Sequence, residues 1–333
     1  MNGRQVTKKN ILLVTCLSNE VGLGHYKRID SIAHFLIGVN YKIHITINDF
    51  PSKSFTNKNY KVVKFEKENF ISSILDYSIK KNIKLIIFDL HHSFIPKKIE
   101  SLFITLINLN IKLISIDGLI DYIKYFEFIF FPSFNFIKPP KKYQDKIIYG
   151  WDCFLINPLF KKVNWGIGKE ILILTGGSDN MKLGQYLPEI LDQEIPDNFN
   201  INWVQGPYAK NPNLKNVNIK RFNVIKNASN LDDIIIKSNY AITLYGVSYF
   251  ELIYYGLPSV VFSPFLKDKK DLLYVKKSKI SLIADNPKDA INKLLILLKN
   301  PIISKKIATN ARNKIKELGG EKLKKIITND WFF

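Results

Sequence analysis

The sequence ILLVTCL at residues 11–17, followed after three polar residues by VGLGHYKR at residues 21–28, decides the fold of this chain. A short and almost continuous apolar run predicts a strand that is buried on both faces, as in a parallel sheet. Glycines directly after such a strand permit a tight turn and a close approach of the backbone to a ligand. Residues 29–39 then show the apolar spacing of a helix. The stretch therefore predicts the opening strand, turn and helix of an α/β sheet.

The same alternation of strand and helix runs along the rest of the chain. In the first half, strands are predicted at residues 41–47, 83–89, 111–116 and 126–131, and helices at 70–80 and 96–109. Prolines and glycines between about 134 and 168 interrupt the pattern, as a linker does. In the second half, strands are predicted at 171–175, 201–205, 217–222, 240–244 and 259–262, and helices at 185–191, 230–238, 248–255, 287–299 and 302–318.

We therefore predict an α/β chain of two Rossmann-like doubly wound domains that face a central cleft. The N-terminal domain spans residues 1–150, the linker residues 151–168, and the C-terminal domain residues 169–333. Ligands of such sheets bind beyond the carboxyl ends of the strands, which places the predicted site in the cleft. The basic tail at 321–333 has two interpretations: a final helix that packs back on the N-terminal domain, or a segment that meets an anionic membrane.

The positive charge of the chain also has two interpretations. Lysine and arginine number 49 against 29 acidic residues, which gives a formal charge of +20. Such a charge either attracts polyanions or reflects a compositional drift towards lysine. The lysines are scattered, and no nucleic-acid-binding motif accompanies them, so we favour drift and expect no specific nucleic-acid partner. Peripheral contact with an anionic membrane stays open as a secondary use of the charge.

The cysteines and the hydropathy pattern are typical of a cytoplasmic protein. Cys16 and Cys153 are too few for a disulfide framework, and neither forms a CxxC pair. The sequence contains no convincing secretory signal and no apolar stretch of the length that spans a bilayer.

The first candidate site is the turn after the first strand, with Gly22, Gly24, His25 and Arg28. A helix N-terminus attracts anions, and both that helix end and Arg28 disfavour a charged imidazole. A neutral imidazole is the form that a general base needs. The alternative is a tight turn with His25 as a helix cap, which we would favour for this motif alone. Lys27 stands where a dinucleotide-binding motif has its third glycine, which argues against NAD.

Two further motifs follow predicted strands of the C-terminal domain. Gly176-Gly177-Ser178-Asp179 suits phosphate oxygens through backbone N–H groups and a hydroxyl, or is a turn that ends in a helix cap. Gly246-x-Ser248-x-x-Glu251 fits either a diphosphate and a ribose or a capping box of Ser248 and Glu251.

Asp89 ends the strand predicted at 83–89 and precedes Leu90, His91 and His92. The carboxyl end of a strand is where the chemistry of α/β enzymes lies. Adjacent histidines ligate one metal poorly and no cysteine or HExxH partner is present, so we expect no metal site. Asp117, which follows the next strand, is a weaker candidate of the same kind, and His34 and His44 are interpreted as structural.

In this order and spacing, the motifs resemble the PseG family of nucleotide-sugar hydrolases and the related SpsG-type proteins, and more distantly the MurG-type glycosyltransferases. The resemblance covers nearly the whole chain and is carried by Gly22-x-Gly24-His25-x-x-Arg28, the stretch YGWDCFLINPLF at 149–160, Gly176-Gly177-Ser178-Asp179, Val204-Gln205-Gly206-Pro207, Gly246-x-Ser248-x-x-Glu251 and Gly256-Leu257-Pro258. The chain departs from the family at Leu90, where a tyrosine is common, and at Tyr245, where a small residue is expected.

The resemblance implies a GT-B architecture in which the C-terminal domain holds UDP. It implies that His25 is the general base, with Asp89 also catalytic, for inverting cleavage of the anomeric C–O bond of a UDP-2,4-diacetamido-2,4,6-trideoxy sugar in surface-glycan or nonulosonic acid biosynthesis. The residues implied to bind substrate are Gly22, Gly24, Arg28, Gly177, Ser178, Gly246, Ser248 and Glu251. No metal or other cofactor is required, because Arg28 and helix N-termini can stabilise the leaving group. An inverting glycosyltransferase with a glycan or lipid acceptor remains the alternative.

Overall fold

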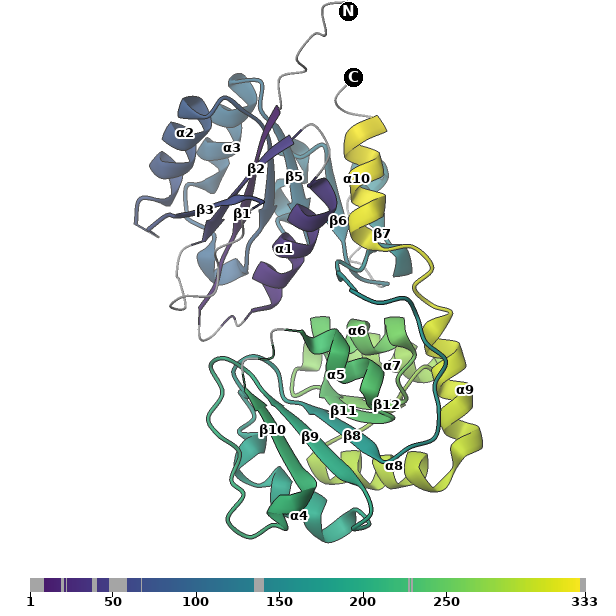
Figure 1. The fold of residues 1–333 in the computed structure, drawn as a ribbon. Helices are drawn as coiled ribbons and strands as arrows, with labels where there is room; N and C mark the ends of the chain where they lie inside the picture. The colour runs from purple at the N-terminus through teal and green to yellow at the C-terminus, as the bar shows by residue number, and fades with distance from the viewer. Residues whose placement is uncertain are drawn as a thin grey trace, which may run out of the picture. The chain divides into compact units, whose positions relative to one another are not determined.

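The computed structural model describes residues 9–18, 21, 23–37, 41–47, 59–66, 68–134, 141–226, 228 and 230–329. The chain divides into two units (Figure 1). Unit 1 consists of Met1–Asn157 together with Glu317–Phe333, and unit 2 is Pro158–Lys316. Each unit is built around one parallel sheet and is described by itself; the expectation that the two sheets face a common cleft stays a prediction.

The sheet of unit 1 has seven parallel strands in the order β3-β2-β1-β4-β5-β6-β7. Its strands are β1 (Lys9–Thr15), β2 (Tyr41–Ile47), β3 (Lys61–Lys64), β4 (Ile83–Asp89), β5 (Lys112–Ile116), β6 (Phe128–Phe131) and β7 (Ile147–Tyr149). Its helices are α1 (Gly24–Leu36), α2 (Phe70–Lys80), α3 (Ile99–Asn108) and α10 (Gly319–Asn329), with short 3₁₀ turns η1 (His92–Phe94), η2 (Ile120–Tyr125), η3 (Lys141–Lys146) and η4 (Trp151–Cys153).

The apolar run of β1 is continuous because both faces of this sheet are covered. Ile11 and Leu13 join the core formed with α1 and α10, whereas Leu12 and Val14 join the core formed with α2 and α3. All four side chains are at most 1% exposed. Full burial of such a side chain contributes about 1.5–3 kcal/mol, so a polar residue on either face would weaken the strand.

Helix α10 packs against α1 and completes one face of the sheet of unit 1. Leu323 and Ile327 of α10 are buried in the core of that face. At the start of the helix, a Cβ added to Gly320 would lie only 1.9 Å from the ring of Phe35, so only glycine allows this approach. The Nζ of Lys322 lies 2.8 Å from a carboxylate oxygen of Asp152, which joins α10 to the turn η4.

Unit 2 repeats the same topology with six parallel strands in the order β10-β9-β8-β11-β12-β13. Its strands are β8 (Glu170–Leu174), β9 (Asn200–Gln205), β10 (Phe222–Lys226), β11 (Tyr240–Leu244), β12 (Ser259–Phe262) and β13 (Leu282–Ile283). Its helices are α4 (Leu187–Glu194), α5 (Leu231–Lys237), α6 (Val247–Tyr255), α7 (Lys269–Ser278), α8 (Pro287–Lys299) and α9 (Pro301–Arg312), with 3₁₀ turns η5 (Leu183–Gln185), η6 (Ile219–Arg221) and η7 (Leu266–Asp268).

The structure corrects several predicted boundaries. Helix α1 begins at Gly24 rather than 29, so the GxGH motif enters the helix itself. The strand predicted at 217–222 is wrong: residues 219–221 form η6, and the strand begins only at Phe222. Strands β3, β7 and β13 and helix α7 were not predicted. Edge strands of two to four residues carry too few apolar side chains to give a pattern.

His44 in β2 is a structural histidine, and its environment predicts a pH-dependent stability. Its Nε2 donates to Oδ1 of Asn10 at 3.3 Å and its Nδ1 accepts from the hydroxyl of Tyr77 at 2.9 Å, an arrangement that suits the neutral ring. Burial, together with Lys42, Lys81 and Lys61, lowers the pKa of His44 to about 4.

In the unfolded chain His44 takes up a proton as the pH falls below 6.5, whereas in the folded chain it does so only near pH 4. Between these two values the unfolded state binds more protons than the folded state, so the free energy of unfolding should decrease as the pH falls. We expect urea unfolding at pH 7 and pH 5 to show this loss. The His44→Asn variant should lose less stability over the same interval, and an equal loss would contradict the assignment.

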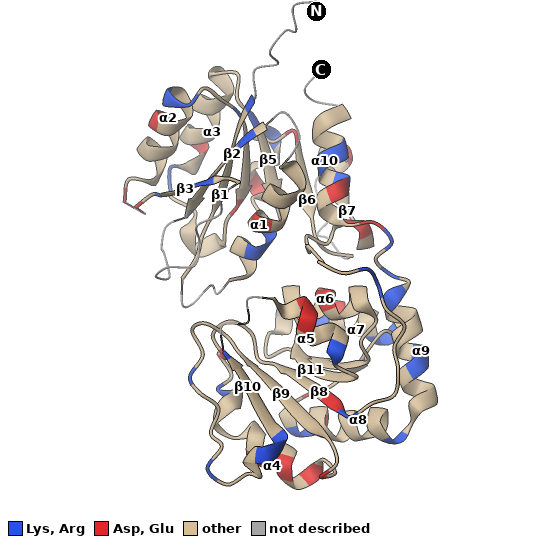
Figure 2. Cartoon of the chain, viewed as in Figure 1, with Lys and Arg blue, Asp and Glu red and all other residues tan. Residues whose placement is uncertain are grey.

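The two sheets share one topological feature that positions the candidate site. In unit 1 the strand order reverses between β1 and β4, and in unit 2 between β8 and β11. Ligands of open α/β sheets bind beyond the carboxyl ends of the strands at such a switch point. Lysine and arginine, by contrast, are spread over many helices and strands of both units (Figure 2). None of the helices among the described residues is long and apolar enough to cross a membrane.

Candidate active site

His25 and Asp89 meet at the switch point of unit 1. Thr15, the last residue of β1, pairs in register with Asp89, the last residue of β4. Because α1 begins at Gly24, soon after β1, His25 lies in its first turn and beside the end of β4. The Nδ1 of His25 is 2.6 Å from Oδ1 of Asp89, and the two side chains are 16% and 0% exposed. One ring nitrogen is thus held by a buried carboxylate.

The charge of Asp89 determines where the proton of the His25 ring lies. Burial would by itself raise the pKa of Asp89, but Arg28 and then His25 outweigh it and hold that pKa below its usual value. An ionised carboxylate only accepts hydrogen bonds, so Nδ1 of His25 carries the hydrogen. In the neutral ring this leaves the lone pair on Nε2, the nitrogen that can accept a proton from a reactant.

The helix-cap interpretation of His25 is therefore wrong. The N-cap of α1 is Leu23, and no side chain makes a cap hydrogen bond there. The ring of His25 binds Asp89 instead. Gly24 is the first residue of α1, and Gly22 lies outside the described residues.

Arg28 binds two carboxylates from neighbouring strands. Its Nε and Nη2 donate to the two oxygens of Asp89, each at 2.7 Å, and its Nη1 lies 2.9 Å from Oδ2 of Asp117. Burial would lower the pKa of Arg28, but the two carboxylates raise it, so the guanidinium stays charged. Its Nη2 is also 3.0 Å from Nδ1 of His25, and since both nitrogens carry hydrogens this is a contact rather than a hydrogen bond.

His91 and His92 lie next to this cluster. The ring of His91 is 5.8 Å from that of His25, edge to face, and 3.9 Å from that of His92. The backbone N–H of His91 donates to Sγ of Cys16 at 3.1 Å, which joins the ends of β1 and β4. Within the described part of the chain, no group of three or more His, Cys, Asp or Glu residues is placed to hold a metal ion.

In unit 2, the glycine-rich turn after β8 is held closely against the end of β9. A Cβ added to Gly206 would lie 2.3 Å from the carbonyl oxygen of Gly176 and 2.4 Å from that of Gly177. Gly176 has φ of 83°, which favours glycine, and nothing lies within 4 Å of where its Cβ would stand. The turn is therefore open beside Gly176.

Asp179 has a structural role in the same turn. Its carboxylate accepts the backbone N–H groups of Leu183 at 2.9 Å and Gly184 at 2.8 Å. Burial raises the pKa of Asp179, and these two hydrogen bonds oppose the shift. The helix-cap interpretation of this motif is wrong, since the N-caps of η5 and α4 are Lys182 and Tyr186, and neither helix start has a side-chain cap hydrogen bond.

After β11, the second strand at the switch point of unit 2, Gly246 directly precedes α6. The start of this helix contradicts the capping-box interpretation of Ser248 and Glu251. The N-cap of α6 is Gly246 and no side chain caps the helix, so Ser248 and Glu251 lie one and four residues beyond its first residue, Val247. No atom lies within 4 Å of where a Cβ of Gly246 would stand. Tyr245, which stands where the resemblance leads one to expect a small residue, donates a hydrogen bond from its hydroxyl to the carboxylate of Asp271 at 2.8 Å.

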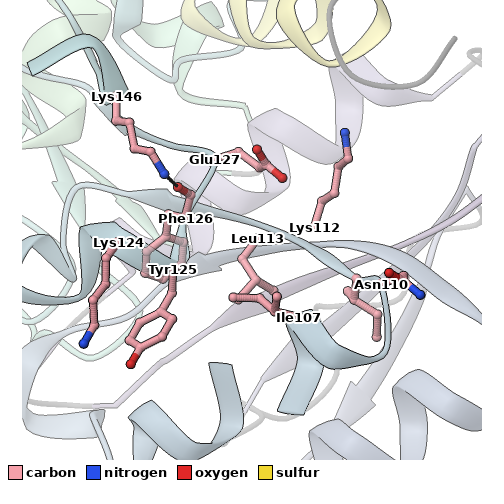
Figure 3. A pocket seen from close by; sticks show the side chains of 10 residues that line it. Ile107, Asn110, Lys112, Leu113, Lys124, Tyr125, Phe126, Glu127 and Lys146 are labelled. Carbon is pink, nitrogen blue, oxygen red and sulfur yellow. Dashed lines mark hydrogen bonds between the residues drawn. The ribbon is translucent and has the colours of Figure 1, made fainter. Parts of the chain in front are cut away.

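A separate pocket in unit 1 lies at the opposite edge of the sheet, before β5, β6 and β7, with a volume of about 410 Å³. Figure 3 shows Lys146 directed at the carbonyl of Phe126, a contact of 2.6 Å, while Lys112 and Lys124 extend in opposite directions. Lys124 is paired with Glu100 at 3.0 Å. The lysines that line the pocket therefore do not converge on one ligand position. The pocket lies before β5, β6 and β7, whereas His25 lies beside the carboxyl end of β4.

The sequence predicted the residues of the cluster but not all of its connections. Asp117 was only a weaker candidate, and its ion pair with Arg28 was missed. The signal that could have found it is topological, because β4 and β5 are neighbours, β4 ends in Asp89 and Asp117 directly follows β5. Their carboxyl ends meet at one edge of the sheet.

No protein-family model and no curated protein sequence matches this chain. Solved structures do match it in fold. MurG of Acinetobacter baumannii aligns with a TM-score of 0.66 at 14% identity, over 96% of this chain and 99% of that protein. A putative UDP-N-acetylglucosamine 2-epimerase of Listeria monocytogenes aligns with a TM-score of 0.65 at 13% identity, over 96% of each chain.

A third structure, the complex of MnaA of S. aureus with UDP, aligns with a TM-score of 0.63 at 10% identity, over 96% of each chain. At such low identities the likeness concerns the fold. Together with the two parallel sheets of seven and six strands, it shows that this chain has the GT-B fold of two Rossmann-like domains that the sequence predicts.

Proposed function

We propose that this protein is an enzyme that cleaves the anomeric C–O bond of a UDP-sugar with inversion, with water as the preferred acceptor. The observation that carries the proposal is the 2.6 Å contact of His25 with the buried Asp89 at the switch point of unit 1. A ring nitrogen held by a carboxylate and a second nitrogen with a free lone pair form a general base. The likeness to nucleotide-sugar enzymes supports the choice of substrate class.

In the proposed reaction His25 removes a proton from the attacking water. The oxygen forms a bond to the anomeric carbon on the face opposite UDP, the C–O bond to UDP breaks, and the electron pair leaves with the diphosphate. The proton resides on Nε2 of His25, and Asp89 stabilises the imidazolium through Nδ1. A general base placed in this way contributes roughly 10²–10⁴ in rate.

The nucleotide is assigned to unit 2. Gly177, Ser178, Gly246 and Ser248 follow β8 and β11, the two strands at the switch point of that sheet. The open side of the turn at Gly246, the N-cap of α6, supports a diphosphate there, because backbone N–H groups at a helix start bind anions. At Gly176 the open side of the glycine-rich turn supports the same assignment. In unit 1, Gly24 is assigned to the border of the diphosphate.

A second candidate is an inverting glycosyltransferase that uses the same base and a hydroxyl of a glycan or lipid as acceptor. The likeness to MurG favours this alternative. Peripheral contact with an anionic membrane belongs to it, since a lipid acceptor would be reached there. The geometry at His25 suits the proton of either a water or an alcohol.

One assay separates the two candidates. UDP-2,4-diacetamido-2,4,6-trideoxyhexose and UDP-N-acetylglucosamine are each incubated with the protein without an acceptor, and UDP and free sugar are followed by ¹H NMR. Steady release of UDP with a sugar of inverted anomeric configuration supports the hydrolase. Release that requires an added glycan or lipid supports the transferase. A product that keeps its UDP would contradict both.

Replacement of Glu251 tests the nucleotide assignment. We expect Glu251→Ala to weaken UDP binding roughly 10- to 100-fold, because hydrogen bonds between a carboxylate and the ribose hydroxyls are lost. Isothermal titration with UDP measures the effect. Glu189→Ala, at an exposed position of α4 in the same unit, is the matched control. Equal affinities of the two variants would show that Glu251 does not contact the ribose.

A further inference from the structure

The guanidinium of Arg28 faces protein carboxylates with three of its nitrogens. Nε and Nη2 bind both oxygens of Asp89, and Nη1 binds Asp117. The Arg28 side chain is only 12% exposed and Asp89 is fully buried. An arginine that binds one carboxylate with two parallel hydrogen bonds is strongly fixed in direction. This arrangement differs from the expectation that Arg28 binds the diphosphate of the substrate.

We propose that Arg28 is a positioning residue that keeps Asp89 ionised and correctly oriented, and thereby keeps the ring proton of His25 on Nδ1, and that Asp117 is a positioning residue that holds Arg28 in place for this role. The inference rests on the proposed function, because it concerns the base of that reaction. Arg28 and Asp117 act on the substrate only through Asp89 and His25.

The reason lies in the burial of Asp89. A carboxyl group without exposure to water favours its neutral form unless a nearby positive charge opposes this. Without Arg28, Asp89 takes up a proton and donates it to Nδ1 of His25. The ring proton then resides on Nε2, and the nitrogen that should accept the proton of the attacking water has no lone pair left.

Asp117 fixes the other side of the guanidinium. It follows β5 with φ of 57°, a backbone conformation that is uncommon outside glycine. Its backbone N–H donates to the carbonyl of Phe130 at 3.0 Å, which holds the residue in this conformation. The side chain is 37% exposed, so the carboxylate can change without opening the core.

Two further titratable groups lie near the ring of His25. His91 faces it at 5.8 Å, and Cys16 accepts the backbone N–H of His91. Burial raises the pKa of Cys16 to about 11, so its thiol is neutral at pH 7. Among these neighbours, Asp89 is the acceptor for Nδ1, Arg28 is the charge that lowers the pKa of Asp89 most, and Asp117 contacts Arg28.

The test reads the tautomer of His25 directly. ¹⁵N-edited NMR spectra of the imidazole groups are recorded on the full chain, and the His25 signals are assigned by their loss in His25→Gln. In the wild type we expect the neutral ring to carry its proton on Nδ1. In Arg28→Met we expect the proton to move to Nε2, whereas Arg28→Lys, which keeps the charge, retains the Nδ1 tautomer. Lys27→Met removes one charge at the neighbouring position and should leave the tautomer unchanged.

Kinetics with UDP-2,4-diacetamido-2,4,6-trideoxyhexose give the second readout. We expect kcat to fall at least about 10-fold in Arg28→Met and by about two- to fivefold in Asp117→Asn, with KM and UDP affinity unchanged. The kcat of Arg28→Lys should lie between that of Arg28→Met and that of the wild type, because lysine keeps the positive charge but cannot make the two parallel hydrogen bonds.

The readouts distinguish failure of this inference from failure of the proposed function. An Nδ1 tautomer retained in Arg28→Met overturns the inference whether or not the sugar is cleaved. A raised KM with unchanged kcat also overturns it, and returns Arg28 to substrate binding. A shifted tautomer in a protein that cleaves no UDP-sugar supports the positioning role and rejects the function. If Arg28→Met does not fold, Asp117→Asn and Arg28→Lys decide, and wild-type kcat in both overturns the inference.

Discussion

The His25→Ala variant is expected to lose roughly 10²- to 10⁴-fold in kcat for release of UDP, while UDP still binds with unchanged affinity. The loss follows because the lone pair of Nε2 is removed, and Asp89, the carboxylate that contacts His25, is bound to Arg28. The binding of UDP survives because the nucleotide is assigned to unit 2. A coupled assay for UDP release and titration calorimetry with UDP measure the two effects.

His34→Ala is the matched control, since His34 lies on the same helix and is exposed. It should keep the turnover of the wild type. Unchanged turnover in His25→Ala would remove this residue from the mechanism. A loss of UDP binding equal to the loss of turnover would instead show that the histidine holds the nucleotide.

The second large effect is expected for Asp89→Asn, with a loss in kcat on the order of 10³-fold. The amide has nearly the shape of the carboxylate, but its N–H₂ group can donate to Nδ1 of His25. The ring proton then moves to Nε2, the tautomer that cannot act as a base. The amide also leaves Arg28 without the charge of its closest carboxylate. The variant is measured in the same UDP-release assay.

Urea unfolding of Asp89→Asn separates the catalytic loss from a loss of folding, because removing one partner of a buried ion pair destabilises a protein by about 3–5 kcal/mol. Asp121→Asn, at an exposed position of η2, is the control for a change of aspartate to asparagine in unit 1. A folded Asp89→Asn protein with the turnover of the wild type would show that the carboxylate has no part in catalysis.

The central strands were predictable from sequence because each is covered on both sides. The strands at 41–47, 83–89, 240–244 and 259–262 were predicted with the bounds that the structure shows. The edge strand β10 was misplaced by five residues, since Val217 gives a false apolar start and residues 219–221 form a 3₁₀ turn. Continuous apolar runs therefore identify the inner strands, among them β4 and β11 at the two switch points.

The site itself was only partly predictable. The motif around His25 and the aspartate at the end of β4 stand 64 residues apart, and no contact between them was predicted. The pairing follows from the parallel register of β1 and β4. The capping-box spacing of Ser248 and Glu251 misled because a spacing of three residues does not locate the first turn of a helix. Gly246 is the N-cap, so both residues lie further along α6.

Because α10 covers the α1 face of unit 1 but is encoded after all of unit 2, this unit cannot complete its core during synthesis until α10 has been made. Until α10 is made, the core surface of unit 1 that later meets Leu323 and Ile327 is exposed to solvent and to chaperones. Unit 2, which is continuous in sequence, can form its whole core earlier. Unit 1 begins first in the sequence but can complete its core only after unit 2 has been made.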